Sequence, residues 1–452
     1  MRVFVDIYGC AAAQAEGEMI RGLLVERGYK LVSRPEEADA IVLVTCIVKK
    51  PTEDRMKNLI KRYYSLVGER LIVYGCMATA ERYIIEKLAP KASIVGNYFL
   101  TKIPEVLEKA SQGIKTKIIG AGVNEIHLGL PRVPLDPLIG TVEVSHGCLG
   151  ICSYCIVRFA RGLHKPFPPD MIVEEVKRLL ARGAIEIRLT GQDLTPYKYN
   201  NERLPDLLRR ISEIPGRFRV RIGMMNPRGL LEFLDDLLDV VYSDRRFYRF
   251  FHIPVQSGSN RILKLMRRFY EAEEFVEIVR KIRSRDPLAT IATDIIVGFP
   301  TETDEDFELT LELIKKTQPD VVNISHYGDR PGTLAAKMPK VPREKVYERS
   351  RRLHELTEKI AFERAKLLIG LEDEVPIMRD DKRFPMGRTF NYKPVYLDSG
   401  SRGQRARVKY YSTRRYAILG KTLELLSRFT DLFSSLLAYP GYRVDIARFA
   451  RL

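Results

Sequence analysis

The chain has 452 residues, more than one hydrophobic core ordinarily serves, so we expect several domains. Hydrophobic residues make up 45% and charged residues 29%, which excludes a disordered chain, and no apolar run approaches the roughly 18 residues of a membrane-spanning helix. With 75 Lys and Arg against 58 Asp and Glu, the formal charge is +17. This charge favours a nucleic acid partner over an anionic membrane surface or a basic surface that binds nothing.

The first part of the chain alternates short apolar strand patterns with helical spacing, in the ranges 3–8, 16–27, 40–45, 52–66 and 71–74. Parallel strands joined by crossover helices are the economical arrangement, so we predict a doubly wound parallel sheet over residues 1–130. The N-terminal residues lack the charged head, apolar middle and small-residue cleavage site of a signal peptide. We therefore expect a cytoplasmic protein with no integral membrane association.

A linker is predicted where Pro131, Pro134 and Pro137 interrupt both helical and strand patterns. After it, strand patterns alternate with helical segments once more, at 141–145, 185–190, 218–224, 250–254, 291–297 and 321–325. Six strands in this alternation suit either a closed or partial parallel barrel or an open sheet, over residues 131–370. A long helical pattern over 343–368 closes this domain.

Cys148, Cys152 and Cys155 form a compact run with three and two residues between them. Thiolates are the usual ligands of iron-sulfur clusters, and three of them hold three corners of a 4Fe-4S cluster while the fourth iron stays open to a substrate. The alternatives are a structural zinc site completed by His146 or His164, or a redox disulfide. No second cysteine pair follows at the spacing of a zinc ribbon, so we favour the cluster.

This spacing, with an aromatic residue before the last cysteine, resembles the signature of the radical S-adenosylmethionine (SAM) superfamily. The resemblance implies a partial (β/α) barrel in which the open iron binds and cleaves SAM. It further implies that Tyr154 lies along the adenine of SAM, that Gln192 and Asp193 meet its methionine amine, and that the 296–300 stretch lines the adenine through residues that include Val297 and Gly298. The alternative for these loops is an ordinary turn at the end of each strand.

The remaining cysteines, Cys10, Cys46 and Cys76, each follow a predicted strand of the first domain. Ligands of open α/β sheets bind outside the carboxyl ends of the strands, where these three thiols would converge. Cysteine also packs well in cores, and that is the alternative for each residue alone. Because a second triad follows downstream, we expect an auxiliary 4Fe-4S cluster with an open iron.

Two cysteine triads and a C-terminal β module together resemble the methylthiotransferase family, and four further stretches (189–193, 221–227, 252–259 and 293–300) resemble its threonylcarbamoyladenosine branch. The resemblance implies transfer of a methylthio group to C2 of N6-threonylcarbamoyladenosine at tRNA position 37. Two SAM molecules per turnover are implied, one to methylate a sulfur at the auxiliary cluster and one to abstract hydrogen from the adenine. Ala11, Ala12 and Ala13 stand where the family more often has polar residues.

Residues 371–424 carry short β-type runs and resemble a TRAM domain, a small all-β RNA-binding barrel. Its basic and aromatic side chains suit a phosphate backbone and unpaired bases, and a solvated basic face is the alternative. The predicted RNA contacts are Arg402, Arg405, Arg407, Lys409, Tyr411, Arg414 and Arg415. Residues 425–452 form an extension without an assigned function, and the amphipathic stretch 423–437 suits a helix packed on its own protein or on a dimer partner better than a membrane-surface helix.

Several functional alternatives stay open at this point. The same chemistry could act on isopentenyladenosine in tRNA or on an aspartate of a ribosomal protein. A protein of another class, a non-catalytic iron-sulfur RNA-binding protein, would use clusters only to order its fold. Partners of the favoured reaction are a tRNA anticodon loop, a reductant protein and an unidentified sulfur source.

Overall fold

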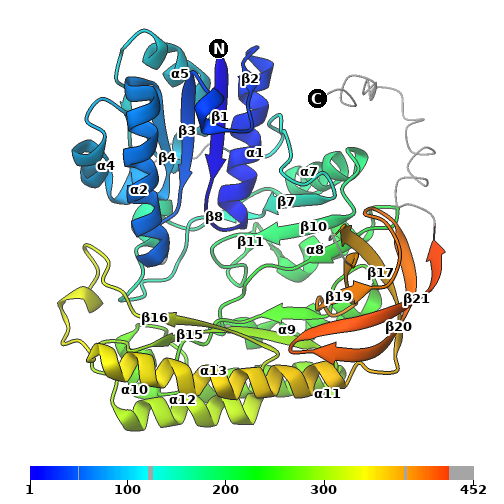
Figure 1. The fold of residues 1–452 in the computed structure, drawn as a ribbon. Coiled ribbons are helices and arrows are strands. Elements are labelled where there is room, and N and C mark those ends of the chain that lie inside the picture. The colour runs from blue at the N-terminus through cyan, green and yellow to red at the C-terminus, as the bar shows by residue number, and fades with distance from the viewer. Residues whose placement is uncertain (49, 121–125, 381–383, 427–452) are drawn as a thin grey trace.

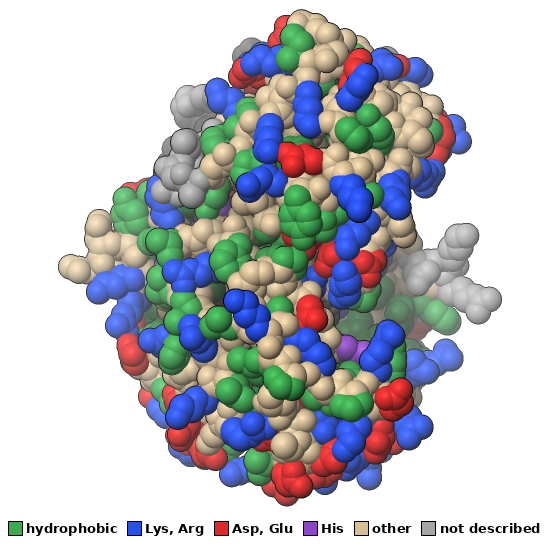
Figure 2. Space-filling model, turned by 90° about the vertical axis from the view of Figure 1, so that its left-hand side faces the viewer, with side chains coloured by type: hydrophobic (Ala, Val, Ile, Leu, Met, Phe, Trp, Pro, Cys, Tyr) green, Lys and Arg blue, Asp and Glu red, His purple; other side chains and the backbone are tan. Residues whose placement is uncertain are grey.

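The structure, a computed structural model, describes residues 1–48, 50–120, 126–380 and 384–426. A parallel sheet with its helices stands over the strands of a second α/β unit, and a small β barrel lies beside that unit (Figure 1). Lys and Arg side chains are scattered over both upper and lower parts of the face in Figure 2 rather than gathered in one patch. None of the described helices is long and apolar enough to span a membrane.

The first unit is a six-stranded, all-parallel sheet in the order β2-β1-β3-β4-β5-β6. Its strands are β1 (Arg2–Ile7), β2 (Lys30–Leu31), β3 (Ala40–Thr45), β4 (Leu71–Gly75), β5 (Ser93–Val95) and β6 (Lys117–Ile118). Its helices are α1 (Ala11–Glu26), α2 (Lys50–Val67), α3 (Cys76–Ala80), α4 (Arg82–Leu88) and α5 (Ile103–Ser111). Separate apolar cores lie on the two faces, one with α1 and α5 and one with α2 and α4, so the predicted doubly wound sheet is confirmed.

The second unit has six parallel strands in chain order: β7 (Ile139–Glu143), β10 (Glu186–Thr190), β13 (Arg219–Arg221), β14 (Phe250–His252), β15 (Thr290–Val297) and β16 (Val321–His326). Two three-stranded sheets are joined through single bridges between β13 and β14, such as Met224 with His252. The helices of this unit are α6 (Val157–Arg161), α7 (Pro169–Ala181), α8 (Leu204–Ser212), α9 (Leu234–Ser243), α10 (Asn260–Leu265), α11 (Ala272–Arg285), α12 (Asp304–Thr317) and α13 (Arg343–Lys366). This arrangement is the expected partial barrel, with two short ribbons inserted, β8 (Ser145–His146) with β9 (Lys165–Pro166) and β11 (Lys198–Tyr199) with β12 (Glu202–Arg203).

The strands of this partial barrel carry most of their apolar residues on one face. Val220, Phe251 and Ile291 point to the surrounding helices and belong to the main apolar core. Since side chains alternate along a strand, the neighbouring residues face the interior, and these are largely polar. The main core of the unit therefore lies outside the strands, and the interior is lined mainly by polar groups, with Phe250 and Ile296 among the exceptions.

The C-terminal unit is a closed barrel in the order β17-β18-β19-β21-β20. Its strands are β17 (Glu372–Arg379), β18 (Met386–Arg388), β19 (Pro394–Leu397), β20 (Arg405–Arg414) and β21 (Ala417–Leu426). The expected helix over 423–437 is wrong at its start, because residues 423–426 continue β21 and pair with the first residues of β20. The rest of that stretch, with the extension to residue 452, lies outside the described residues.

The predicted linker packs closely on the first unit. The Val133 N–H donates to the Glu18 carbonyl at 3.0 Å, and the Leu135 N–H donates to the Glu18 carboxylate at 3.0 Å. A Cβ at Gly22 of α1 would lie 2.2 Å from the Pro131 carbonyl oxygen, so only glycine allows this approach. The segment thereby holds the first unit against the barrel.

Asp320, directly before β16, joins the partial barrel to the small barrel. Its carboxylate is fully buried and accepts from Lys393 at 2.8 Å, from Arg364 of α13 at 3.2 Å and from the Ile291 N–H at 3.0 Å. Burial alone would raise the pKa of Asp320, but Lys393 and Arg364 hold it below 3.8. The ionised carboxylate therefore stabilises the fold.

Replacing Asp320 by Asn should lower the free energy of unfolding by about 3–5 kcal/mol, because it leaves buried cations without their counter-charge. The stabilisation is present above the unfolded pKa near 3.8 and is lost as the pH falls through the lower folded pKa. Thermal unfolding at neutral and acidic pH measures both effects. Asp235→Asn, at an exposed ion pair with Lys281, is the matched control, and an equal loss in the two variants would contradict this account.

Candidate active site

The first cysteine triad lies at the carboxyl edge of the N-terminal sheet. Cys10 precedes α1, Cys46 follows β3 and Cys76 opens α3 directly after β4, and the strands before them are neighbours in the sheet. A Cβ at Gly9 would lie 3.1 Å from the Cβ of Cys46, so these two loops touch. Cys46 and Cys76 are buried while Cys10 is exposed, and burial raises the pKa of Cys46 to about 11. The carboxyl ends of β1 and β3 point toward the barrel (Figure 1).

The second triad lies in the loop between β8 and α6. The Gly150 N–H donates to the Cys148 Sγ at 3.2 Å, and a Cβ at Gly150 would lie 3.2 Å and 3.5 Å from the sulfurs of Cys148 and Cys152. The loop therefore wraps closely around its thiols. Burial raises the pKa of Cys148 to about 11 and that of Cys155 to about 12, so in the absence of iron these thiols stay protonated.

Arg268, which the sequence analysis did not single out, reaches the second triad. It is 8% exposed, and its guanidinium donates to the Cys152 Sγ at 3.5 Å and to the Pro254 carbonyl at 2.9 Å. Ser153 ties the same loop to the segment before Arg268 through an N–H bond to Met266 O at 3.0 Å. A cation at a thiolate cluster offsets its negative charge, and here the backbone carbonyl fixes the direction of the guanidinium.

The two triads are joined through α3 and α6, which pack on each other. Asn97 makes this connection directly, because its side-chain amide donates to the Ala160 carbonyl at 2.9 Å and lies 3.7 Å from the Cys76 Sγ. Arg330, in the loop after β16, donates to Val48 O at 3.0 Å and to Glu53 at 2.5 Å. The barrel thus supports the Cys46 and Cys76 loops of the first unit from two sides.

Arg161, at the end of α6, is buried at the junction of the two α/β units, close to the first triad. It is 1% exposed, pairs with both oxygens of Glu16 of α1 and lies 3.7 Å from Glu143 at the end of β7. Burial alone would lower its pKa, but Glu16 and the thiols of Cys76 and Cys10 raise it. This cation therefore neutralises two acids and lies close enough to the first triad to offset thiolate charge.

Glu16, Glu143 and His146 offer donor atoms within 4.8 Å of one another, which raises the question of a metal ion. The Arg161 guanidinium already lies against both carboxylates, and a divalent cation would meet its positive charge. We assign the group to charge balance at the junction. His146 packs on the Tyr98 ring at 5.3 Å, which turns it toward the first unit.

The predicted SAM contacts are partly brought together. The Tyr154 ring lies edge-on to Phe299 at 6.4 Å, and both belong to an apolar group with Ile296. The side-chain oxygen of Gln192 is buried without a hydrogen bond among the described residues, so it is available to a ligand. Asp193 instead accepts the N–H groups of Thr195 and Asn226 at 3.0 Å each, which holds two strand-end loops together.

Val297 and Gly298 were predicted to contact the adenine of SAM, and the structure places their side chain and backbone differently. The Val297 side chain is fully buried in the helix-side core, so it turns away from the interior, and Ile296 and Phe299 supply the apolar wall instead. Alternation along β15 decides this, because neighbouring residues face opposite sides. Gly298 has a φ of +72°, and its N–H donates to Glu302 at 2.9 Å. A Cβ at Gly298 would lie 2.4 Å from Val346 of α13, so glycine allows the helix to pack closely here.

Most of the predicted RNA contacts are exposed on the small barrel. Alternate residues of β20 and its following turn point outward, namely Arg407, Lys409, Tyr411, Arg414 and Arg415. Arg405 is the exception: it is 3% exposed in its side chain and pairs with Glu374, so we remove it from the RNA-contact set. Arg402 is half-buried and pairs with Asp136 of the linker, which leaves it a docking role.

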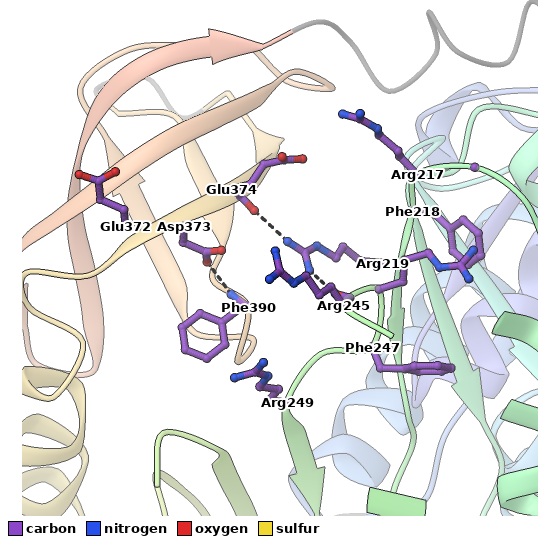
Figure 3. Close-up of a pocket in the computed structure, with 12 residues that line it drawn as sticks. Arg217, Phe218, Arg219, Arg245, Phe247, Arg249, Glu372, Asp373, Glu374 and Phe390 are labelled. Atoms are coloured by element: carbon purple, nitrogen blue, oxygen red, sulfur yellow. Dashed lines mark hydrogen bonds between the residues drawn. The ribbon is translucent and has the colours of Figure 1, made fainter. Parts of the chain in front are cut away.

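A cleft of about 690 Å³ lies between the small barrel and the segments that lead into the amino ends of β13 and β14 (Figure 3). One wall carries Arg217, Arg219 and Arg245, and the other carries the acidic run 372–374 of β17. Arg219 donates to the Glu374 carbonyl at 2.9 Å and to the Arg245 carbonyl at 2.5 Å, so it links the two barrels. Because an acidic wall faces the basic one, the cleft lacks the uniformly positive lining that an RNA backbone requires, and it does not belong to the proposed RNA interface.

Arg161→Gln should lower the free energy of unfolding of the cluster-free protein by about 3–5 kcal/mol, because Glu16 and Glu143 lose their buried counter-charge. Denaturant unfolding measures the loss, and Arg158→Gln on the same helix is the control, with a change within about 0.5 kcal/mol. In the double variant with Glu16→Gln, part of the loss should be recovered. Strict additivity of the two single variants would contradict the proposed pairing.

Two family descriptions match the chain, and between them they include both triads. Residues 142–314 match the Radical SAM superfamily, and residues 2–96 match the Uncharacterized protein family UPF0004. Among solved structures, a radical S-adenosylmethionine methyltransferase from Kitasatospora setae is similar, with a TM-score of 0.55 over 74% of this chain and 73% of that chain. Its 15% sequence identity limits the likeness to the fold.

Two curated relatives align with nearly the whole chain. A probable threonylcarbamoyladenosine tRNA methylthiotransferase from Methanothermobacter thermautotrophicus is 38% identical over 90% of this chain and 96% of its own length. A tRNA-2-methylthio-N(6)-dimethylallyladenosine synthase from Pseudothermotoga lettingae is 33% identical over 88% of this chain and 93% of its own. The chain therefore belongs to the methylthiotransferase family of the radical SAM superfamily, in its threonylcarbamoyladenosine tRNA methylthiotransferase branch.

Proposed function

We propose that this protein adds a methylthio group to C2 of N6-threonylcarbamoyladenosine at position 37 of tRNA, and that it does so in the cytoplasm. The observation that carries the proposal is that the loops of the two cysteine triads adjoin: α3, which opens with Cys76, packs on α6, which directly follows the loop of Cys155. Attaching sulfur to an unactivated ring carbon requires a sulfur source and a radical source close together. The Methanothermobacter relative, which is named for threonylcarbamoyladenosine, supports the choice of substrate.

The residues present fit two 4Fe-4S clusters and SAM, the cofactors of this family. We assign Cys148, Cys152 and Cys155 to one cluster and the triad of Cys10, Cys46 and Cys76 to the other. Each triad offers three thiols on closely wrapped loops and lacks a fourth, which suits a cluster with one open iron. When bound, these cofactors supply reductive cleavage of SAM at one triad and a sulfur carrier at the other.

The protein's own residues orient and insulate this chemistry. Arg268 and Arg161 offset negative charge at the second and first triad and tie their loops to buried partners. Tyr154, Phe299 and the unpaired oxygen of Gln192 offer apolar and polar contacts for SAM. The first unit packs on the partial barrel through α1 on β7 and α3 on α6, and excluding water at this contact protects a reactive centre.

The tRNA is bound in this proposal by the exposed side chains of β20 and the turn after it. Cations follow the phosphate backbone, while Tyr411, 59% exposed, offers a face for stacking. The target base must leave its stack to enter the barrel. A reductant protein and a separate sulfur source complete the partners that the reaction requires.

Cys148→Ala and Cys46→Ala should each lower the iron content of anaerobically reconstituted protein from about eight to about four atoms per chain, because each variant removes a ligand of one cluster only. Iron analysis and electron paramagnetic resonance measure the change. Complete retention of iron in either variant would contradict the assignment of that triad. Asp235→Asn is a surface control with full iron content.

The function is tested by incubating reconstituted protein with SAM, a reductant and tRNA that carries N6-threonylcarbamoyladenosine. Mass spectrometry of the nucleosides should show the 2-methylthio derivative, with release of 5′-deoxyadenosine. Modification of isopentenyladenosine alone would favour the second candidate, which the Pseudothermotoga relative supports. Modification of a ribosomal protein, or no 5′-deoxyadenosine at all, would overturn the proposal in favour of another acceptor or of a non-catalytic RNA-binding protein.

A further inference from the structure

Polar side chains line much of the interior of the partial barrel, and strand pairing aligns them across neighbouring strands. Strand pairing aligns Arg221 of β13 with Arg188 of β10 and with Thr141 of β7. Two residues further toward the carboxyl ends of β10 and β7, Thr190 pairs with Glu143 and also faces the interior. Glu143 contacts Arg161. One strand repeat of about 7 Å therefore separates the level of Arg221 from the junction between the cysteine triads.

A cavity of about 950 Å³ opens at the Arg221 level, between the partial barrel, α13 and the small barrel. Phe250 and Arg221 line its inner wall, and Tyr392, from the loop before β19, closes it from the small barrel. The turn between β20 and β21 contributes Arg415 and Tyr416 to its rim. The cavity thus connects the barrel interior with the surface that we propose binds RNA.

Two arginines in this cavity lack an anionic partner. Among the described residues, the side chains of Arg221 and Arg388 make no hydrogen bond or ion pair, and the Arg221 Nε is buried without a partner. Their guanidinium groups lie 5.3 Å and 4.7 Å from the centroid of the Tyr392 ring, and that of Arg221 lies 4.9 Å from the Phe250 ring. Aromatic contacts orient these cations but leave their charge without a counter-ion.

The acidic groups nearby are engaged or peripheral. Glu186 accepts from Arg188 at 2.6 Å and from the Tyr248 hydroxyl at 3.0 Å, and Asp320 is paired with Lys393. Glu355 and Glu358 of α13 line the cavity but are exposed at its rim. Burial lowers the pKa of Arg221, and an anion bound beside it would oppose that shift. The cavity therefore has an excess of positive charge that an anionic ligand can balance.

We propose that this cavity binds the carboxylate of the N6-threonylcarbamoyl group, with Arg221 as a specificity-determining residue and Arg388 beside it. The inference rests on the proposed function and names the part of the substrate that the cavity reads. The threonyl substituent ends in a carboxylate and a hydroxyl, whereas a dimethylallyl substituent is uncharged and apolar. A guanidinium pairs with a carboxylate in two parallel hydrogen bonds, and a polar site of this kind rejects an analogue that leaves it unpaired.

The test compares two anticodon stem-loop RNAs that differ only in this carboxylate, one with N6-threonylcarbamoyladenosine and one with its methyl ester. Binding to the reconstituted protein is measured by fluorescence polarisation. The wild-type protein should bind the acid at least about tenfold more tightly than the ester. Arg221→Gln should reduce that ratio to about twofold or less, while Arg70→Gln, at an exposed site of the first unit, should keep it.

Equal binding of acid and ester by the wild-type protein would overturn the inference even if Arg221→Gln failed to fold. A variant that weakens both RNAs equally would also overturn it, because Arg221 would then contact an RNA phosphate. These outcomes are separate from the fate of the proposed function. That function fails only if the wild-type protein leaves the threonylcarbamoyladenosine unmodified at C2.

Discussion

The active-site region depends on a single buried cation, Arg161. It is supplied by α6 of the partial barrel, and the acids that it neutralises come from α1 of the first unit and from β7. Without it, two carboxylates would be buried together at the junction, and burial with the nearby Glu16 already raises the pKa of Glu143. The charge that holds the two units together also lies beside the first cysteine triad. The same ion pairs of Arg161 therefore hold the two units together and set the charge beside the first triad.

A second constraint is the direction of the strands. Both α/β units use parallel strands, so the loops at their carboxyl ends are the natural sites for functional groups. The two sets of loops meet because the linker packs along α1 and leaves the first sheet standing over the barrel. Arg330 and Asn97 then tie the facing loops together. Two thiol triads far apart in the chain become neighbours through this geometry.

The small barrel contributes to the site as well as to the proposed RNA surface. Lys393 reaches Asp320 of the partial barrel, and Tyr392 lies between the inward-facing Arg221 and Arg388 of its own barrel. The β20–β21 hairpin extends toward α13 (Figure 1). Binding of RNA on this hairpin and entry of a base into the barrel would thus share one surface.

The sequence by itself determined the alternation of strands and helices, the doubly wound first sheet and the positions of the six cysteines in the chain, while the partial barrel followed from the family resemblance. Local patterns were sufficient there, because apolar periodicity and close cysteine spacing do not depend on distant contacts. Polar and apolar residues also alternate within β10, as in Glu186, Ile187 and Arg188, and within β13, where Arg221 follows Val220. This pattern alone does not indicate that the polar face lines an interior.

Only the tertiary structure decided which charged side chains face the site. It removed Arg405 from the RNA surface by burial against Glu374, turned Val297 toward the helices, and continued β21 through residues that suggested a helix. It also selected Arg161 and Arg268 from a chain with 75 basic residues. The reason is physical: the partner of a buried charge lies far away in sequence, and one residue's shift along a strand reverses the side it faces.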